Sequence, residues 1–281
     1  MVGVLGVSAS AILVRFSQAP SGVTAAYRLG WTVLLLLPVV LLRCRAELRR
    51  VTARDLVLCG ASGVLLALHF LTWFESLKRT SVASSTVLVS TEVIFTALGF
   101  ALFLHGKIPR LGVWAILLAF GGSALLALSG GGGAGELSGN LLALAAASAA
   151  AVYTLIGRIQ RGHLSTTVYT FLTYLACFLT LLLGTAAAGT PLTGYGGREC
   201  LIGLALAVLC TLLGHSLFSW CLKYLSPSYV SAAKLCEPVF SSLAAIPLFG
   251  EVPGPLQLAG GAAVLGAVLL YTWAEREKTP A

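Results

Sequence analysis

Residues 81–103 read SVASSTVLVSTEVIFTALGFALF, and the only charged side chain among them is that of Glu92. A helix of about 20 mostly apolar residues spans the hydrocarbon core of a bilayer. The stretch therefore predicts a membrane-spanning helix with one carboxyl group near its middle. A charged group at the bilayer centre costs about 2.5–3.5 kcal/mol on insertion scales, so Glu92 is a candidate functional residue.

Apolar segments of similar length fill most of the remaining sequence. Together with residues 81–103 they give ten candidate spans, at residues 2–16, 22–42, 55–76, 81–103, 110–129, 138–157, 165–186, 200–222, 228–249 and 254–274. Hydrophobic residues make up 58% of the 281-residue chain and charged residues only 10%, whereas soluble domains contain about 25% charged residues. We therefore predict an all-α membrane protein with ten transmembrane helices.

The surroundings of Glu92 recur 145 residues further along the chain, around Glu237. Residues 90–98 read STEVIFTAL, and residues 235–243 read LCEPVFSSL. The similarity is weak, but it extends to Lys78, which has Lys223 at the same offset. An internal repeat of this length predicts that the ten helices form two groups of five.

The repeat sets the predicted domain organisation. We expect a first five-helix half at residues 1–129, a glycine-rich link at 130–137, and a second five-helix half at 138–281. Because five is odd, the second half must enter the membrane in the opposite orientation. The result is a pair of inverted repeats around a central cavity, an arrangement that recurs among transporters.

Basic residues lie in short runs between the apolar segments, which is the positive-inside pattern and not a nucleic-acid-binding patch. If the N-terminus is cytoplasmic, the cytoplasmic connections carry twelve basic residues: Arg43, Arg45, Arg49, Arg50, Arg54, Lys107, Arg110, Arg158, Arg161, Lys223, Arg276 and Lys278. The opposite connections carry three: Lys78, Arg79 and Arg198. We therefore predict that both termini are cytoplasmic. The compact chain, with no targeting extension, suits a bacterial inner (cell) membrane.

Several motifs in the second half resemble those of a known family. They are Lys223-Tyr224-Leu225-Ser226-Pro227, Glu237-Pro238-Val239-Phe240-Ser241-Ser242-Leu243 and Phe249-Gly250-Glu251. On these residues the chain resembles the EamA family of the drug/metabolite transporter superfamily, over nearly its whole length. The resemblance implies ten helices, a cavity between two five-helix halves, and movement of small organic solutes. It also implies similarity to exporters of amino acids and other metabolites.

Two interpretations of Glu92 and Glu237 stay open. In a proton-coupled exporter, a buried carboxyl group alternately binds a proton and the substrate. The alternative is a structural hydrogen bond, which Pro238 favours because proline leaves the carbonyl of Lys234 without its helical donor. Lys234 lies three residues before Glu237 and shares its helix face. We expect these two residues to form an intrahelical ion pair, or else to face the substrate together.

Three further polar residues lie inside predicted spans. Arg28 is expected to recognise the carboxylate of an amino or organic acid with its planar fork of donors, or to form an ion pair with Glu92. His69 and His215 occupy similar places in the third and eighth spans. Either histidine is expected to shuttle protons or to pack as a hydrogen-bonded core residue.

Aromatic residues complete the candidate site. Trp73, Tyr153 and Trp220 lie within predicted spans. Such side chains line many binding pockets and stack on apolar or planar solutes. Packing between helices is the alternative for each of them.

Missing motifs narrow the functional classes. The sequence has no GxxxxGK[ST] loop for ATP, no HExxH or Gly-x-Ser-x-Gly motif, and no cysteine and histidine spacing typical of a metal site. We therefore predict no enzymatic activity, no cofactor and no metal. We predict a secondary active transporter, most simply an exporter, that works by alternating access as a monomer or homodimer. The alternatives are a lipid or lipid-carrier flippase and an organic solute exchanger of the same fold.

Overall fold

The computed structural model describes residues 2–103, 110–129, 134–225, 227–232, 234 and 236–276, and every regular element in this part of the chain is a helix. The order is α1 (Val2–Phe16), α2 (Ser21–Arg43), α3 (Arg45–Leu48), α4 (Ala53–Arg79), α5 (Val82–Val89), α6 (Glu92–Phe103), α7 (Arg110–Ser129), α8 (Ala134–Gln160), α9 (Thr166–Ala187), α10 (Gly196–Ala205), η1 (Leu206–His215), α11 (Ser216–Cys221), α12 (Pro227–Ala232), α13 (Cys236–Phe249) and α14 (Pro255–Arg276). The predicted all-α class is confirmed for these residues.

Among the described residues, seven helices are long and apolar enough to cross a membrane, judged by length and composition: Ser21–Arg43, Ala53–Arg79, Val82–Phe103, Gly135–Gln160, Thr166–Ala187, Gly196–Cys221 and Pro255–Ala274. Three shorter apolar helices lie at Gly6–Phe16, Arg110–Leu125 and Glu237–Phe249. Each of the ten overlaps one predicted span. The chain is therefore a multi-pass membrane protein.

Three predicted spans are less regular than their sequences suggest. Residues 81–103 form two helices, α5 and α6, separated at Ser90 and Thr91. Residues 228–249 are likewise divided into α12 and α13. The span at 200–222 passes through the π-helical segment η1, a rare geometry that often occurs at functional sites. The predicted link at 130–137 is already helical from Ala134 onward, and its first residues lie outside the described part.

The chain folds as two compact units, and each unit combines segments from both halves of the sequence. One unit contains Met1–Leu71 and Ile156–Leu225, and the other contains Thr72–Leu155 and Ser226–Ala281. Two of the three boundaries fall inside α4 and α8, and the third falls between α11 and α12. The first unit therefore holds α1 to α3 and α9 to α11, and the second holds α5 to α7 and α12 to α14.

Small residues set the helix packing in the first unit, where α2 packs along α9 and α1 packs along η1. A Cβ atom added to Gly63 of α4 would lie 2.6 Å from the carbonyl oxygen of Thr173 and 2.8 Å from the backbone nitrogen of Cys177, both in α9. Glycine is the residue that permits such a close approach of two backbones.

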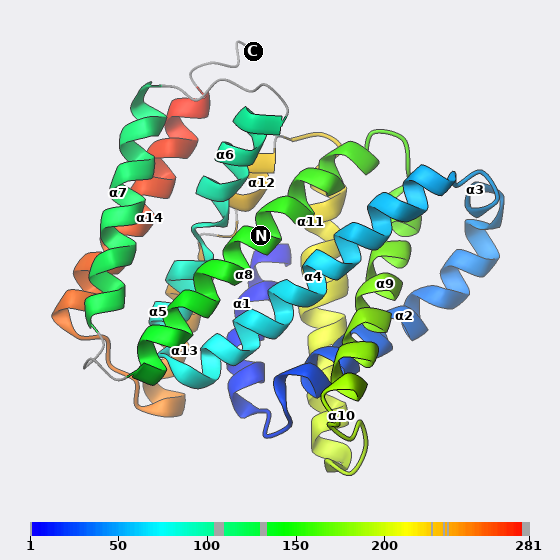
Figure 1. Cartoon of the computed structure of the whole chain (residues 1–281), viewed down its shortest axis with the longest axis horizontal. Helices are drawn as coiled ribbons and strands as arrows, with labels where there is room; N and C mark the ends of the chain where they lie inside the picture. The colour runs from blue at the N-terminus through cyan, green and yellow to red at the C-terminus, as the bar shows by residue number, and fades with distance from the viewer. Residues whose placement is uncertain are drawn as a thin grey trace. The chain divides into compact units, whose positions relative to one another are not determined.

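In the second unit, α7 and α14 run side by side (Figure 1) and form the most extensive helix pair. Gly122 of α7 has no room for a side chain, because an added Cβ would lie 2.9 Å from the Gly260 carbonyl oxygen. Buried apolar residues of α6, α7 and α14 form the adjoining core. This core supports α6, whose first turn carries Glu92.

Candidate functional site

Both predicted glutamates lie in the first turn of a helix that follows a break. Glu92 begins α6, directly after the turn that ends α5, and Glu237 is in the first turn of α13, shortly after α12 ends. Discontinuous helices of this kind form substrate and ion sites in membrane transporters, because the chain has unpaired backbone groups where the helix is interrupted. The two breaks occupy matching places in the internal repeat.

Local side-chain chemistry accounts for each break. At the first one, the Ser90 hydroxyl donates to the Thr86 carbonyl at 2.9 Å, and the Thr91 hydroxyl donates to the Leu88 carbonyl at 2.6 Å. Each carbonyl also accepts a backbone N–H, from Ser90 at 3.3 Å for Thr86 and from Thr91 at 3.1 Å for Leu88. Additional hydroxyl bonds of this kind bend helices. At the second break, Pro238 stands near the start of α13, where its missing N–H is tolerated.

The Glu92 carboxylate is buried and accepts hydrogen bonds from Thr154, Ser231 and Lys234. Its Oε1 accepts from the hydroxyls of Thr154 and Ser231, each at 2.9 Å, and from Lys234 Nζ at 3.0 Å. Its Oε2 accepts from Lys234 Nζ at 2.9 Å. The side chain of Glu92 is 8% exposed and that of Lys234 is 15% exposed. The donors come from α8, α12 and the break that follows α12.

Lys234 thus has a partner that sequence reasoning did not foresee. The sequence paired Lys234 with Glu237, three residues away on the same predicted helix face. The structure describes Lys234 between α12, which ends at Ala232, and α13, which begins at Cys236. Its ammonium group lies against Glu92 at the start of α6, and the predicted pair with Glu237 stays a prediction.

Three other predicted site residues belong to the same compact unit as Glu92. Glu237 is 8% exposed, Tyr153 is 5% exposed, and Trp73 is 3% exposed. Tyr153 precedes Thr154, a donor to Glu92, and the Trp73 ring lies 5.8 Å from that of Phe74. All three side chains are therefore buried in the unit that contains the ion pair.

Arg28 occupies a separate polar cluster in the first unit, where its side chain is fully buried. Its Nε donates to the Thr211 hydroxyl at 2.7 Å, and one terminal nitrogen donates to the Ser10 hydroxyl at 3.2 Å. The guanidinium carbon lies 4.2 Å from the centre of the Phe70 ring, a distance at which cation–π attraction operates. The guanidinium group therefore ties α2 to α1, α4 and η1.

The two predicted histidines lie close together in this cluster. The ring centres of His69 and His215 are 6.3 Å apart, and Phe70 packs edge-on against His215 at 5.5 Å. His215 ends η1, and Thr211 within η1 donates to the Leu206 carbonyl five residues earlier. The π-helical geometry therefore helps to place both a histidine and the acceptor of Arg28.

Trp220 is the most exposed of the predicted site residues. Its side chain is 49% exposed, and its ring lies 5.1 Å from that of Tyr224. This arrangement resembles the aromatic belt at a membrane surface more than the lining of a closed site.

An apolar groove of about 500 Å³ lies between α5, α13 and α14. Residues along it include Val87, Pro238, Leu243, Val252, Leu258 and Gly261. Leu243 and Leu258 are each 60% exposed. We call this feature the α13–α14 groove. The sequence did not predict it, because the apolar residues of a membrane helix do not reveal which of them leave space between helices.

The polar residues at one end of this groove lie at or just before the starts of α5 and α14. Gln257 Nε2 donates to the hydroxyls of Ser81 and Ser84 at 3.3 and 3.2 Å. Glu251 Oε2 accepts from the backbone N–H of Val82 at 2.8 Å. These contacts fasten the start of α14 to the start of α5.

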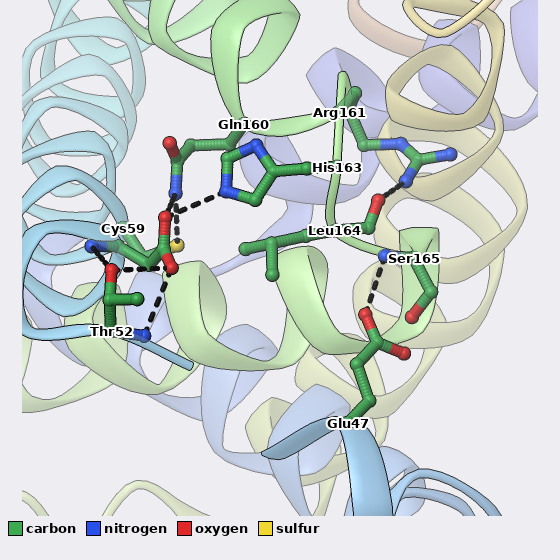
Figure 2. A network of polar contacts seen from close by, with 9 residues as sticks. Glu47, Thr52, Cys59, Gln160, Arg161, His163, Leu164 and Ser165 are labelled. Atoms are coloured by element: carbon green, nitrogen blue, oxygen red, sulfur yellow. Dashed lines mark hydrogen bonds and ion pairs between the residues drawn. The ribbon is translucent and has the colours of Figure 1, made fainter. Parts of the chain in front are cut away.

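A second polar network, also missed by the sequence analysis, surrounds Asp55 at the start of α4. Figure 2 labels its partners Thr52, Gln160 and His163. Asp55 Oδ2 accepts from the backbone N–H and hydroxyl of Thr52, at 3.0 and 2.7 Å. Its Oδ1 accepts from Gln160 Nε2 at 3.2 Å and lies 2.7 Å from His163 Nε2. The Thr52-x-x-Asp55 spacing is a capping box that the sequence displays, whereas the partners near residue 160 are visible only in the fold.

The same network extends along the connection between α8 and α9. Glu47 accepts from the backbone N–H of Ser165 at 2.7 Å, and Arg161 donates to the carbonyls of Ser219 and Leu164. Burial lowers the pKa of the Arg161 guanidinium from its ordinary value. Figure 2 shows Glu47 and Arg161 on either side of the Leu164–Ser165 turn, so this turn is fastened from both sides.

Within the described residues, no group of three or more histidine, cysteine, aspartate or glutamate side chains is placed to hold a metal ion. The polar centres are instead an ion pair, a buried arginine with two nearby histidines, and a helix-capping network.

Comparison with known proteins supports the helical fold described above. A solved crystal structure aligns over 99% of this chain and 96% of its own length, with a TM-score of 0.69 and 19% sequence identity. The two chains therefore share a fold. A probable terminal-alkyne amino-acid exporter of Streptantibioticus cattleyicolor is 28% identical over 233 residues, which cover 79% of this chain and 75% of the exporter. An uncharacterized protein of Pseudomonas aeruginosa is 34% identical over 183 residues, or 63% of this chain and 62% of that protein.

The model of the EamA-like transporter family matches twice, over residues 1–128 and residues 137–273. Together the two matches cover nearly the whole chain and include both broken helices. The family expected from the sequence motifs is confirmed, and with it the assignment as a membrane transporter. The chain belongs to the EamA-like transporter family.

Proposed function

We propose that this chain is a secondary active exporter of small metabolites, such as amino acids or amphipathic organic compounds, in a bacterial inner membrane. One observation carries the proposal: a buried glutamate at the break of a membrane helix forms an ion pair with a lysine at the matching break of the other half. A buried pair of this kind is energetically demanding to keep, so its presence favours a functional role. The amino-acid exporter among the relatives supports the substrate class.

The proposed architecture is ten transmembrane helices in two inverted five-helix repeats. Helix pairing supports it. The equivalent second, fourth and fifth helices of the two halves pack on each other, as α2 with α9, α5 with α13, and α7 with α14. Two halves related by a two-fold axis in the membrane plane bring equivalent helices into contact wherever those helices lie beside the axis. The observed pairing is therefore the one expected of inverted repeats. Exchange of the conformations of the two halves then gives alternating access.

The polar residues receive separate proposed roles. Glu92 and Lys234 bind the substrate, Glu92 or Glu237 is the carboxyl group that accepts a coupling proton, and Tyr153 and Trp73 line the path. His69 and His215 are candidates for proton transfer in the other unit. We assign Arg28 a positioning role, because its described bonds hold η1 against α1 and α2. We propose no catalytic residue, since the family is one of transporters.

The proposed orientation places both termini in the cytoplasm. The connections that follow α2 and α8 then lie on the cytoplasmic side, where the Asp55 network joins them. The distribution of twelve against three basic residues supports this orientation.

Reconstituted protein tests the proposal. We expect labelled amino acids to enter proteoliposomes saturably, and to enter faster when the lumen is more acidic than the outside, since protons leaving the lumen would drive exchange. Glu237→Gln is expected to remove the effect of the pH gradient. Failure of every labelled amino acid to enter would contradict amino-acid export.

The α13–α14 groove favours a second candidate function, movement of a lipid or lipid carrier. The groove is apolar, partly exposed, and ends at polar side chains, as a lipid tail and head group would require. Gly261→Trp would fill the groove, and Gly266→Trp is a matched control because a Cβ at Gly266 meets nothing within 4 Å. Lipid transfer between leaflets, followed with a fluorescent phospholipid and slowed only by Gly261→Trp, would favour this candidate. No transfer by the unaltered protein would exclude it.

A further inference from the structure

The connection between α2 and α4 carries the densest group of basic residues in the chain. Only residues 44–52 separate the apolar span Ser21–Arg43 from the span Ala53–Arg79, and the short helix α3 lies between them (Figure 1). We call residues 43–54 the arginine segment. Its arginines are Arg43, Arg45, Arg49, Arg50 and Arg54. Because so few residues join the two spans, we expect the arginine segment to lie at the depth of the lipid head groups.

The inner face of the arginine segment is apolar and holds the segment against the protein. Cys44, Leu48 and Val51 pack against a buried cluster that includes Cys59 of α4 and Tyr169 of α9. Burial of these side chains fixes which face of the segment points inward. The arginine side chains are therefore presented from a backbone that is packed in place.

The two acidic groups in and beside the arginine segment are bonded to the connection between α8 and α9 or to the segment's own backbone. Glu47 accepts from the backbone N–H of Ser165 at 2.7 Å, and Figure 2 shows its side chain directed toward Ser165. Asp55, directly after the segment, accepts from Thr52 and Gln160. Within the described residues, neither carboxylate forms an ion pair with an arginine of the segment.

The outer face of the arginine segment consists of exposed guanidinium groups. All five arginines are exposed. In the part of the chain that the structure describes, no hydrogen bond or ion pair joins their side chains to another residue. A guanidinium group carries five donors in a planar fork that matches the oxygens of a phosphate group. The outer face thus offers five such forks at a membrane surface.

Exposed apolar side chains adjoin the arginines at both ends of the segment. Leu42, in the last turn of α2, is 83% exposed, and Val57, in the second turn of α4, is 70% exposed. Leu41 and Leu56 beside them are also exposed. A ligand that fits both features has a phosphate group joined to long apolar chains, which is the chemistry of a phospholipid.

We propose that the arginine segment is a binding surface for anionic phospholipids. The phosphate groups bind the guanidinium groups, and the acyl chains lie against the exposed apolar side chains of α2 and α4. Clusters of basic residues next to a membrane helix bind anionic lipids in this way, and each basic residue near the surface strengthens binding by about fivefold. Such binding concerns the membrane and not the transported solute, so its test is independent of the export proposed above.

Two lipids with the same acyl chains isolate the effect of head-group charge. Dioleoylphosphatidylglycerol is anionic, and dioleoylphosphatidylcholine has no net charge. Native mass spectrometry of the full chain in detergent gives the fraction of chains that carry each lipid as its concentration rises, and hence a Kd. We expect phosphatidylglycerol to bind at least about tenfold more tightly, and the preference to decrease at high ionic strength. Equal binding of the two lipids would overturn the proposal.

Two triple variants test whether the arginine segment is responsible. Arg45→Gln/Arg49→Gln/Arg50→Gln removes three outward charges and leaves the apolar inner face intact. It is expected to weaken phosphatidylglycerol binding by about tenfold or more, with little effect on phosphatidylcholine. Arg45→Lys/Arg49→Lys/Arg50→Lys keeps the charges and is expected to stay within about threefold of the unaltered chain. Unchanged affinity in the glutamine variant would overturn the proposal.

A matched control removes three exposed arginines from other parts of the chain. Arg79→Gln/Arg110→Gln/Arg198→Gln lowers the net charge by the same amount. It is expected to keep the preference for phosphatidylglycerol. A loss as large as that of the segment variant would show that binding follows total charge and not the segment, and would overturn the proposal.

A soluble phosphate ester separates a lipid surface from a site for free phosphate. Glycerol 3-phosphate carries the phosphate without acyl chains, and a tenfold excess is expected to leave phosphatidylglycerol bound. Complete displacement would overturn the assignment to lipid. Because the substituted side chains are exposed, the variants are expected to keep the thermal unfolding midpoint of the unaltered chain. If the glutamine variant does not fold, a lysine variant without the head-group preference, or a preference unaffected by salt, overturns the proposal.

Discussion

Lys234 Nζ lies 3.0 and 2.9 Å from the two carboxylate oxygens of Glu92, although 142 positions separate the two residues in the chain. The contact joins the break between α5 and α6 to the break between α12 and α13. Each break divides one apolar span into two helices, and the ion pair connects Glu92, at the start of α6, with Lys234, which lies between α12 and α13. The two halves of the sequence thus meet at a charged pair within one compact unit.

The buried pair is expected to be sensitive to loss of one partner and tolerant of loss of both. Lys234→Met leaves the Glu92 carboxylate buried without its cation, which is expected to lower the free energy of unfolding by about 3–5 kcal/mol. Adding Glu92→Gln should recover most of this loss, because no charge remains uncompensated. Thermal or denaturant unfolding in detergent measures both effects. A double variant no more stable than Lys234→Met would show that the pair does not account for the loss.

The close contact of α4 with α9 gives a prediction that is independent of charge. Gly63→Ala places a methyl group within 2.6–2.8 Å of the α9 backbone, so we expect a loss of about 1–3 kcal/mol in the free energy of unfolding. Gly60 lies almost one turn earlier on α4, and a Cβ there meets nothing within 4 Å. Gly60→Ala is therefore expected to leave stability unchanged or to raise it by up to about 1 kcal/mol. Equal effects of the two variants would contradict the packing described for α4.

Arg28 is expected to act through its shape as well as its charge. Arg28→Lys keeps the positive charge but loses the planar group that bonds Thr211 and stacks on Phe70. We expect a loss of about 1–3 kcal/mol in the free energy of unfolding, with little change in the KM for transport. The opposite pattern, unchanged stability with a raised KM, would move Arg28 from a positioning role to direct contact with substrate.

The Asp55 network is expected to stabilise the first turn of α4. Asp55→Asn replaces one carboxylate oxygen with an amide NH₂ group, which donates and does not accept. The residue then loses its bonds either from Thr52 or from Gln160 and His163. We expect this change to weaken the helix cap by about 1–2 kcal/mol. Amide hydrogen exchange near residues 52–56 should then become faster. Arg54→Gln, at an exposed neighbouring position, is the control and should leave exchange unchanged. Unaltered exchange in Asp55→Asn would show that the network does not stabilise this helix start.

The sequence predicted the membrane helices well, because the length of each apolar segment and the basic residues between segments can be counted directly in the sequence. Every predicted span overlaps an apolar helix, and the family motifs around Glu237 led to the correct family. The interruptions were harder to predict. Pro238 marked the second break, whereas the first depends on Ser90 and Thr91, which are common in intact membrane helices.

The sequence predicted which residues belong to the candidate site, but it did not predict which of them contact one another. Helical spacing paired Lys234 with Glu237, and that pair stays a prediction, whereas the contact of Lys234 with Glu92 depends on the packing of segments far apart in the sequence. Thr154 and Ser231, the donors that orient Glu92, gave no signal, because a hydroxyl in an apolar span more often bonds its own helix. Long-range contacts of this kind follow from the packing of α6, α8 and α12, which the local sequence does not encode.

Uptake of labelled leucine by proteoliposomes preloaded with unlabelled leucine tests the central claim most directly, with Glu92→Gln beside the unaltered protein. The account predicts saturable counterflow by the unaltered protein and its loss in the variant. The double variant Glu75→Gln/Arg79→Gln, which removes an exposed ion pair between residues four apart on α4, is expected to retain counterflow. Counterflow at an equal rate in Glu92→Gln would contradict the claim that the Glu92–Lys234 pair is the transport site.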